Sequence, residues 1–154
     1  MEAISAPGYV SADSGVITRL TSRSPDSAAY AGWVDERLIA ISFQVKAELL
    51  SCRYSEARIS RLRALVASCV DLKHSEATNV WYARVADKRR ELQRAGHDGG
   101  NAGQADMWVI SSTLEHGLVL LAHDRALVRL AREMGLRVFT NLPGLRDGNP
   151  TESR

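Results

Sequence analysis

The sequence has few cysteines and no long apolar run. Its two cysteines, Cys52 and Cys69, belong to no CxxC pair and to no Cys/His ligand spacing, so neither a disulfide framework nor a zinc site is indicated. No stretch approaches the roughly 20 apolar residues that a membrane-spanning helix needs. The opening residues, MEAISAPG, contain an acid and lack the apolar centre of a signal peptide. We therefore expect a cytoplasmic protein with no membrane association.

Sequence motifs of several enzyme classes are also missing. The glycine-rich segment 97–103, HDGGNAG, has neither the Lys and Ser/Thr of a P-loop nor the GxGxxG order of a dinucleotide site. We expect this segment to be a flexible connector. No Ser lies in a GxSxG elbow. His123 directly precedes Asp124, and neighbours on a strand point to opposite faces, so a Ser/His/Asp triad is not predicted.

The size and composition are those of one globular domain. The chain has 154 residues, of which 45% are hydrophobic and 25% are charged. We expect a single domain over 1–154, with an ordered core over about 9–142 and a polar, flexible tail over 144–154. A net charge of +2 is too small to indicate a nucleic-acid partner by itself.

Basic side chains gather in three predicted helices and allow two interpretations. The clusters lie within 53–63, 88–94 and 125–132. Solvated helix faces commonly carry such charges. The third cluster begins with Arg125, beside Asp124, where it would attract a polyanion toward a neighbouring acidic pocket. Arg125 is therefore a candidate substrate contact, with a solvated helix face as the alternative.

Hydrophobic periodicity predicts strands and helices in alternation. Short apolar runs typical of buried parallel strands occur at 9–12, 38–42 and 118–121, with weaker strands at 70–72 and 137–140. Helical patterns fill the segments between them. This alternation predicts an α/β fold, namely a three-layer αβα sandwich with a mostly parallel sheet of four or five strands.

Four acids lie at or near the ends of the predicted strands. Asp13 and Asp124 come directly after strands. Asp106 opens the helix that leads into the strand at 118–121, and Glu48 lies in the helix after the second strand. Because the carboxyl ends of parallel strands meet at one edge of the sheet, we expect these carboxylates to share a pocket. The alternatives are that Asp106 and Asp124 stabilise helix N-termini and that Glu48 is an exposed helical residue.

Carboxylates gathered in one pocket repel each other unless some are protonated or a cation is present. An oxygen-rich set of ligands, without matching His or Cys, favours Mg²⁺ or Mn²⁺ over zinc. At a phosphodiester, such an ion lowers the pKa of a bound water and stabilises charge on the leaving oxygen. The acids therefore predict a metal-dependent phosphodiester hydrolase.

The segment from Asp106 to Asp124, DMWVISSTLEHGLVLLAHD, resembles the C-terminal half of a PIN domain, especially that of the VapC-like toxins of bacterial toxin–antitoxin pairs. VSADSGVI and ISFQVKAELL resemble the first strand of that family and its Glu-bearing helix. The resemblance covers about 9–140. It implies a PIN-like fold and a Mg²⁺- or Mn²⁺-dependent endoribonuclease whose metal-binding and catalytic acids are Asp13, Glu48, Asp106 and Asp124.

The same resemblance makes Ser14 the hydroxyl beside the first acid. His123, directly before Asp124, could replace part of the hydrogen bonding beside the metal ligands or touch the substrate, and Arg125 is a candidate substrate contact by its charge. It also implies an RNA substrate, a cognate antitoxin that blocks the acidic pocket, and a homodimer. The chain departs from the family pattern at Gly15, where an Asn is expected, and at Ala122-His123, where Thr-Asn is expected. Lost polar groups beside metal ligands weaken metal binding. A non-catalytic PIN-like module that binds RNA or a protein is therefore a second hypothesis, and a nuclease acting on DNA is a third.

Overall fold

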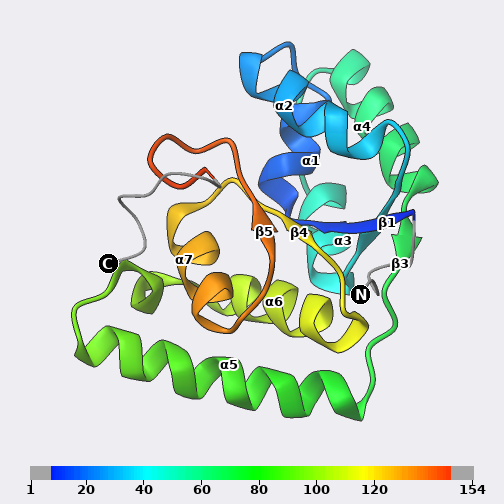
Figure 1. The fold of residues 1–154 in the computed structure, drawn as a ribbon. Helices are drawn as coiled ribbons and strands as arrows, with labels where there is room; N and C mark the ends of the chain where they lie inside the picture. Colours follow the sequence, from blue (N-terminus) through cyan, green and yellow to red (C-terminus); the bar gives the residue numbers. More distant parts are fainter. Residues whose placement is uncertain (1–7, 147–154) are drawn as a thin grey trace.

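The structure is a computed structural model, and it describes residues 8–146. Helices and strands alternate along the chain as predicted (Figure 1). In chain order they are β1 (Tyr9–Ala12), α1 (Ser14–Leu20), α2 (Pro25–Val34), β2 (Leu38–Ile41), α3 (Phe43–Leu50), α4 (Glu56–Ser68), β3 (Val70–Asp71), α5 (Glu76–Arg94), the 3₁₀ turn η1 (Asp98–Asn101), α6 (Gln104–His116), β4 (Leu120–Leu121), α7 (Arg125–Glu133) and β5 (Val138–Phe139).

The strands form one parallel sheet in the order β3-β2-β1-β4-β5. Ser11 at the centre of β1 lies opposite Ala40 of β2 on one side and Leu120 of β4 on the other. β2 and β3 therefore extend the sheet on one side of β1, and β4 and β5 extend it on the other side. In open parallel sheets, ligands bind at the carboxyl ends of the two strands where the order reverses, which here are β1 and β4.

Helices lie on both sides of the sheet. Figure 1 shows α2 and α4 at the top of the molecule and the long α5 along the bottom, with the strands between them. Both residues of β4 are fully buried, and the last three residues of β1 are almost fully buried. Strands covered on both faces explain the continuous apolar runs of the sequence. The predicted α/β three-layer sandwich with a parallel sheet is confirmed.

The expectation of a flexible connector at 97–103 is wrong. Most of this segment forms η1, in which Gly99 and Gly100 are buried. A Cβ atom on Gly100 would lie 2.5 Å from the backbone nitrogen of Gln93, so only glycine allows the turn to pack directly on α5. The turn also packs against α7. The glycines therefore serve close packing, which polar composition alone does not reveal.

In residues 8–146, no helix has both the length and the apolar character needed to cross a membrane. The predicted flexible tail over 144–154 lies outside the described residues from position 147 onward. Its described part includes Leu145, which is buried. Packing therefore extends slightly beyond the core boundary expected near residue 142.

Candidate active site

A pocket of about 270 Å³ lies at the carboxyl ends of β1 and β4. It is lined by Asp13, Ser14, Gly15, Arg19, Glu48, Ala105, Asp106, Val109, His123 and Asp124. The four carboxylates selected from the sequence thus line one pocket, together with Ser14 and His123. Arg125 does not line it, because its Nε donates to Oδ2 of Asp98 at 2.8 Å.

A larger hollow, of about 630 Å³, lies at the opposite ends of β1 and β2. Tyr9 and Leu38, the first residues of these strands, are among its lining residues. Ligand sites of open parallel sheets lie at the other edge of the sheet. We therefore take the smaller, acidic pocket as the candidate site.

Asp13 follows β1 and caps the N-terminus of α1. Its Oδ1 accepts a hydrogen bond from the backbone nitrogen of Val16 at 2.8 Å, and its Oδ2 accepts one from that of His123 at 3.3 Å. Burial raises the pKa of this carboxyl to about 7; the two hydrogen bonds oppose the rise, and the charges of Asp106 and Asp124 add to it. Near neutral pH, a carboxyl with this pKa exchanges its proton readily.

Asp106 and Asp124 each combine a capping hydrogen bond with a free oxygen. Oδ2 of Asp106 accepts from the backbone nitrogen of Gly103 at 3.0 Å, and Oδ1 of Asp124 accepts from that of Leu127 at 2.9 Å. The second oxygen of each has no hydrogen bond within residues 8–146. Capping and a position in the pocket are therefore compatible, and both interpretations drawn from the sequence apply to the same side chains.

The acids of the pocket also affect one another electrostatically. Burial raises the pKa of Asp106, the hydrogen bond from Gly103 lowers it, and the charges of Asp124 and Glu48 raise it again. Glu48 reaches the pocket from α3, whose N-cap Ser42 directly follows β2. Each of two strand-following turns and two helices thus delivers one carboxylate to the same small volume.

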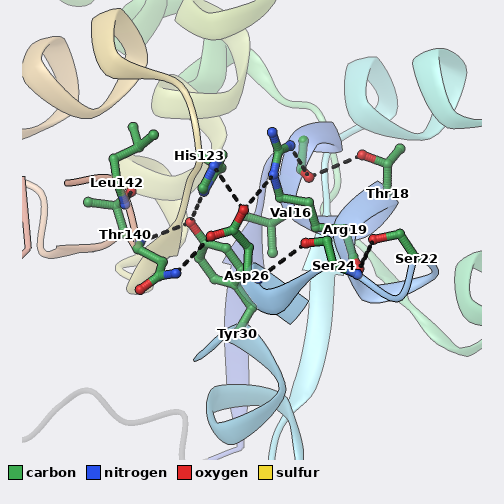
Figure 2. A network of polar contacts seen from close by, with 12 residues as sticks. Val16, Thr18, Arg19, Ser22, Ser24, Asp26, Tyr30, His123, Thr140 and Leu142 are labelled. Atoms are coloured by element: carbon green, nitrogen blue, oxygen red, sulfur yellow. Dashed lines mark hydrogen bonds and ion pairs between the residues drawn. The ribbon is translucent and has the colours of Figure 1, made fainter. Parts of the chain in front are cut away.

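A polar network lies beside the pocket (Figure 2). The hydroxyl of Tyr30, a fully buried side chain, donates to the backbone oxygen of Ala122 and contacts Nδ1 of His123. Nε2 of His123 and Nε of Arg19 lie 3.7 and 3.8 Å from the same oxygen, Oδ2 of Asp26. Burial and then the charge of Arg19 lower the pKa of His123, and Asp26 raises it by less. The imidazole is therefore neutral near pH 7.

The strand-alternation argument for His123 and Asp124 was wrong. β4 ends at Leu121, so these two residues follow the strand and both line the pocket. Sequence reasoning also missed Arg19, Asp26 and Tyr30. Arg19 carried a usable signal, since it lies four residues after Gly15 on the helix that begins directly after Asp13. Asp26 and Tyr30 reach His123 only through tertiary packing.

The set of donors fits a hard divalent cation by its chemistry, because four carboxylates supply oxygen ligands and crowd negative charge. Burial is the main cause of the raised pKa values of Asp13 and Asp106, and the charges of the neighbouring acids add to both. Within residues 8–146, no three His, Cys, Asp or Glu side chains approach closely enough to enclose an ion as they stand.

No protein family model matches the sequence, and no curated protein matches it. Solved structures do match. VapBC2 from Rickettsia felis, bound to a DNA fragment from its promoter, is 19% identical, with 86% of this chain and 98% of that chain covered and a TM-score of 0.64. VapBC-1 from nontypeable Haemophilus influenzae is 19% identical, with 86% and 97% covered and a TM-score of 0.61.

A third similar structure is VapBC-5 from Mycobacterium tuberculosis, a member of the VapBC family of toxin–antitoxin systems. It is 21% identical, with 87% of this chain and 98% of that chain covered and a TM-score of 0.55. At such identities these matches establish the fold. The resemblance of the sequence to VapC-like PIN domains is thereby confirmed at the level of architecture.

Proposed function

We propose that this protein is a Mg²⁺- or Mn²⁺-dependent endoribonuclease and the toxin of a toxin–antitoxin pair, acting in the cytoplasm. The observation that carries the proposal is the gathering of four carboxylates in one pocket at the ends of β1 and β4. The similarity of fold to the VapBC structures supports it.

Asp13, Asp106 and Asp124, with Glu48, are the residues that would hold the cation. When bound, the cation lowers the pKa of a water molecule and offsets the charge of the phosphodiester. In the metal-free protein burial raises the pKa of the Asp13 carboxyl to about 7, and a bound cation would favour its ionised form. The backbone hydrogen bonds to the three aspartates keep their carboxylates at the pocket wall.

Cleavage of labelled single-stranded RNA by the purified protein in Mn²⁺ tests the proposal. We expect cleavage that EDTA abolishes and that Asp13→Asn removes while the circular dichroism spectrum is retained. Asp71→Asn is the matched control, because Asp71 also ends a strand but lies exposed outside the pocket and pairs with Lys46. Cleavage by Asp13→Asn at the wild-type rate would contradict the proposal. Single-stranded DNA assayed in parallel separates a ribonuclease from a deoxyribonuclease.

An antitoxin partner and a homodimer are parts of the same proposal. The three similar structures are VapBC complexes, and one is named as a toxin–antitoxin system. Co-expression with the product of an adjacent small open reading frame should yield a complex in which RNA cleavage is inhibited. Light scattering on the isolated chain should give the mass of a dimer. The mass of a monomer would contradict the proposed homodimer. An adjacent gene product that neither binds nor inhibits the protein would contradict the proposed antitoxin.

A non-catalytic module that binds RNA or a protein is the second candidate. It is favoured by the separation of the carboxylates, since no three of them enclose an ion as they stand in residues 8–146. Isothermal titration with Mn²⁺ distinguishes the two functions. Saturable binding that Asp13→Asn weakens supports the nuclease, whereas absence of binding supports the module.

A further inference from the structure

We propose that Arg19 binds a phosphate group of the RNA strand at the mouth of the acidic pocket, in a space that Gly15 leaves open. This inference rests on the proposed function, since the phosphate belongs to the phosphodiester substrate. It adds a substrate-binding residue to a site otherwise defined by its acids.

Arg19 brings a guanidinium to a wall formed largely by carboxylates. It lies in the last turn of α1 and lines the pocket with Asp13 and Asp124. Its NH1 group donates to the backbone oxygen of Gly15 at 3.0 Å, which holds the side chain back along the helix toward the pocket (Figure 2). Its NH2 group has no hydrogen bond within residues 8–146, and the side chain is 35% exposed. The guanidinium is therefore anchored at one nitrogen and open at another.

Gly15 keeps the space between this guanidinium and the carboxylate of Asp13 free. A Cβ atom on Gly15 would lie 3.5 Å from NH1 of Arg19 and 3.5 Å from Oδ1 of Asp13. Any side chain longer than alanine would therefore start between the two groups. With glycine at this position, Arg19 and Asp13 border one continuous opening.

The negative charge of the pocket favours a cationic side chain at its mouth, where RNA phosphates would approach. An RNA strand carries a negative charge on each phosphate, and four carboxylates line the pocket that it must approach. A guanidinium presents two parallel N–H groups that match the oxygens of a phosphate, which an ammonium group does not. The existing ion pair of Arg19 with Asp26 is 3.8 Å long and partly exposed, so it is weak and is readily exchanged for a phosphate.

A structural role for Arg19 makes a different prediction. Its positive charge in the last turn of α1 complements the helix dipole, and its loss would lower stability without changing RNA binding. The two roles separate in the salt dependence of RNA affinity, because each phosphate contact to a single strand contributes a slope of about 0.7 to log K against log salt.

Fluorescence anisotropy with a labelled single-stranded RNA tests the proposal. All variants carry Asp106→Asn and are measured in Mg²⁺, so that binding is followed without cleavage. We expect Arg19→Ala to weaken binding by about tenfold or more and to lower the salt slope by about 0.7. Arg19→Lys should retain the slope and lose part of the affinity. Arg23→Ala is the matched control, since Arg23 lies exposed four residues later and does not line the pocket.

Three results would overturn the inference: equal affinity and slope for Arg19→Ala and its parent, an equal loss for Arg23→Ala, or no RNA binding by the parent. Thermal unfolding confirms that Arg19→Ala is folded. Cleavage assays in Mn²⁺ on proteins with Asp106 intact keep this inference apart from the proposed function. If the wild type cleaves RNA and Arg19→Ala cleaves it equally well, only the role of Arg19 is refuted. If the wild type does not cleave RNA but its RNA binding depends on Arg19, only the nuclease function is refuted.

Discussion

Asp106 and Glu115 lie at opposite ends of the same helix, α6, and their carboxylates have opposite surroundings. At the pocket end, burial and the charges of Asp124 and Glu48 raise the pKa of Asp106, against one backbone hydrogen bond. At the other end, burial raises the pKa of Glu115, but the hydrogen bonds from the hydroxyls of Ser75 and Thr78 together outweigh burial. The net shift of this pKa is therefore downward.

This contrast separates an acid that stabilises the fold from one that, in the proposed function, would bind a cation. The charge of Glu115 is met by neutral donors at the N-terminus of α5, and the contact ties α5 to α6. Burial is the main cause of the raised pKa of Asp106; one backbone hydrogen bond opposes it, and the charges of Asp124 and Glu48 add to it. A folded chain tolerates that arrangement only through protonation or an external cation. The two acids of α6 thus differ in the direction of their pKa shifts, and only the acid of the pocket end shifts upward.

The largest effect is expected when the charge of Asp106 is removed, and the same change at Glu115 provides the comparison. Asp106→Asn should lower Mn²⁺-dependent RNA cleavage by about 100- to 1000-fold, because it removes one of the carboxylates that would hold the cation. Glu115→Gln keeps the shape of its side chain and should leave cleavage unchanged. Initial rates at saturating Mn²⁺ measure both. Equal losses in the two variants would remove the distinction between the ends of α6.

The pH dependence of stability provides the second test. Asp13 ionises near pH 3.8 in an unfolded chain and near pH 7 in the folded protein, so the folded state holds the extra proton between these values. Its stabilising contribution is complete below pH 3.8 and is lost as the pH rises through 7, by at most about 4 kcal/mol. Urea unfolding in metal-free buffer from pH 4 to 7.5 measures this loss. Asp13→Asn should flatten the profile, and a profile unchanged by that substitution would show that the carboxyl titrates normally.

Removing the structural acid should affect stability and not catalysis. In Glu115→Ala, the fully buried Thr78 loses the partner of its hydroxyl, and we expect a destabilisation of about 1–3 kcal/mol. Urea unfolding measures the change, and cleavage at a temperature well below the midpoint should equal that of the wild type. Reduced cleavage by a fully folded variant would place Glu115 in the functional region.

The smallest expected effect comes from Tyr30→Phe. Its hydroxyl contacts the backbone oxygen of Ala122 and the ring of His123, and it accepts from the backbone nitrogen of Asn141. Loss of these bonds should cost about 1 kcal/mol of stability and should lower cleavage by about tenfold through a misplaced His123. Parallel unfolding and cleavage assays check both values. A stability change without a change in cleavage would assign this network to the scaffold alone.

Much of the fold could be predicted because its signals are local. The apolar runs of the strands are visible in short windows of sequence. So are Asp13 directly after β1, Asp124 shortly after β4, and the stop of α6 at Gly117. The convergence of the acids then follows from the parallel sheet, since all strand ends of one kind meet at one edge.

The remainder depends on contacts between distant segments. Tyr30 meets His123 across 93 positions, and no pattern in either segment points to the other. The glycines of 97–103 resemble those of a mobile loop, although Gly100 is required by the nearby backbone of Gln93. A glycine needed for close approach and a glycine that permits motion look identical in a single sequence.

The compact turn η1 has a practical consequence for labelling this protein. Polar, glycine-rich segments between helices are the usual choice for inserting epitope tags or fluorophores. Here an insertion would break the pair between Asp98 and Arg125 and push α7 away from α5. In the segment between α3 and α4, residues 53–55 are exposed, and we expect a reporter there to disturb the packing less.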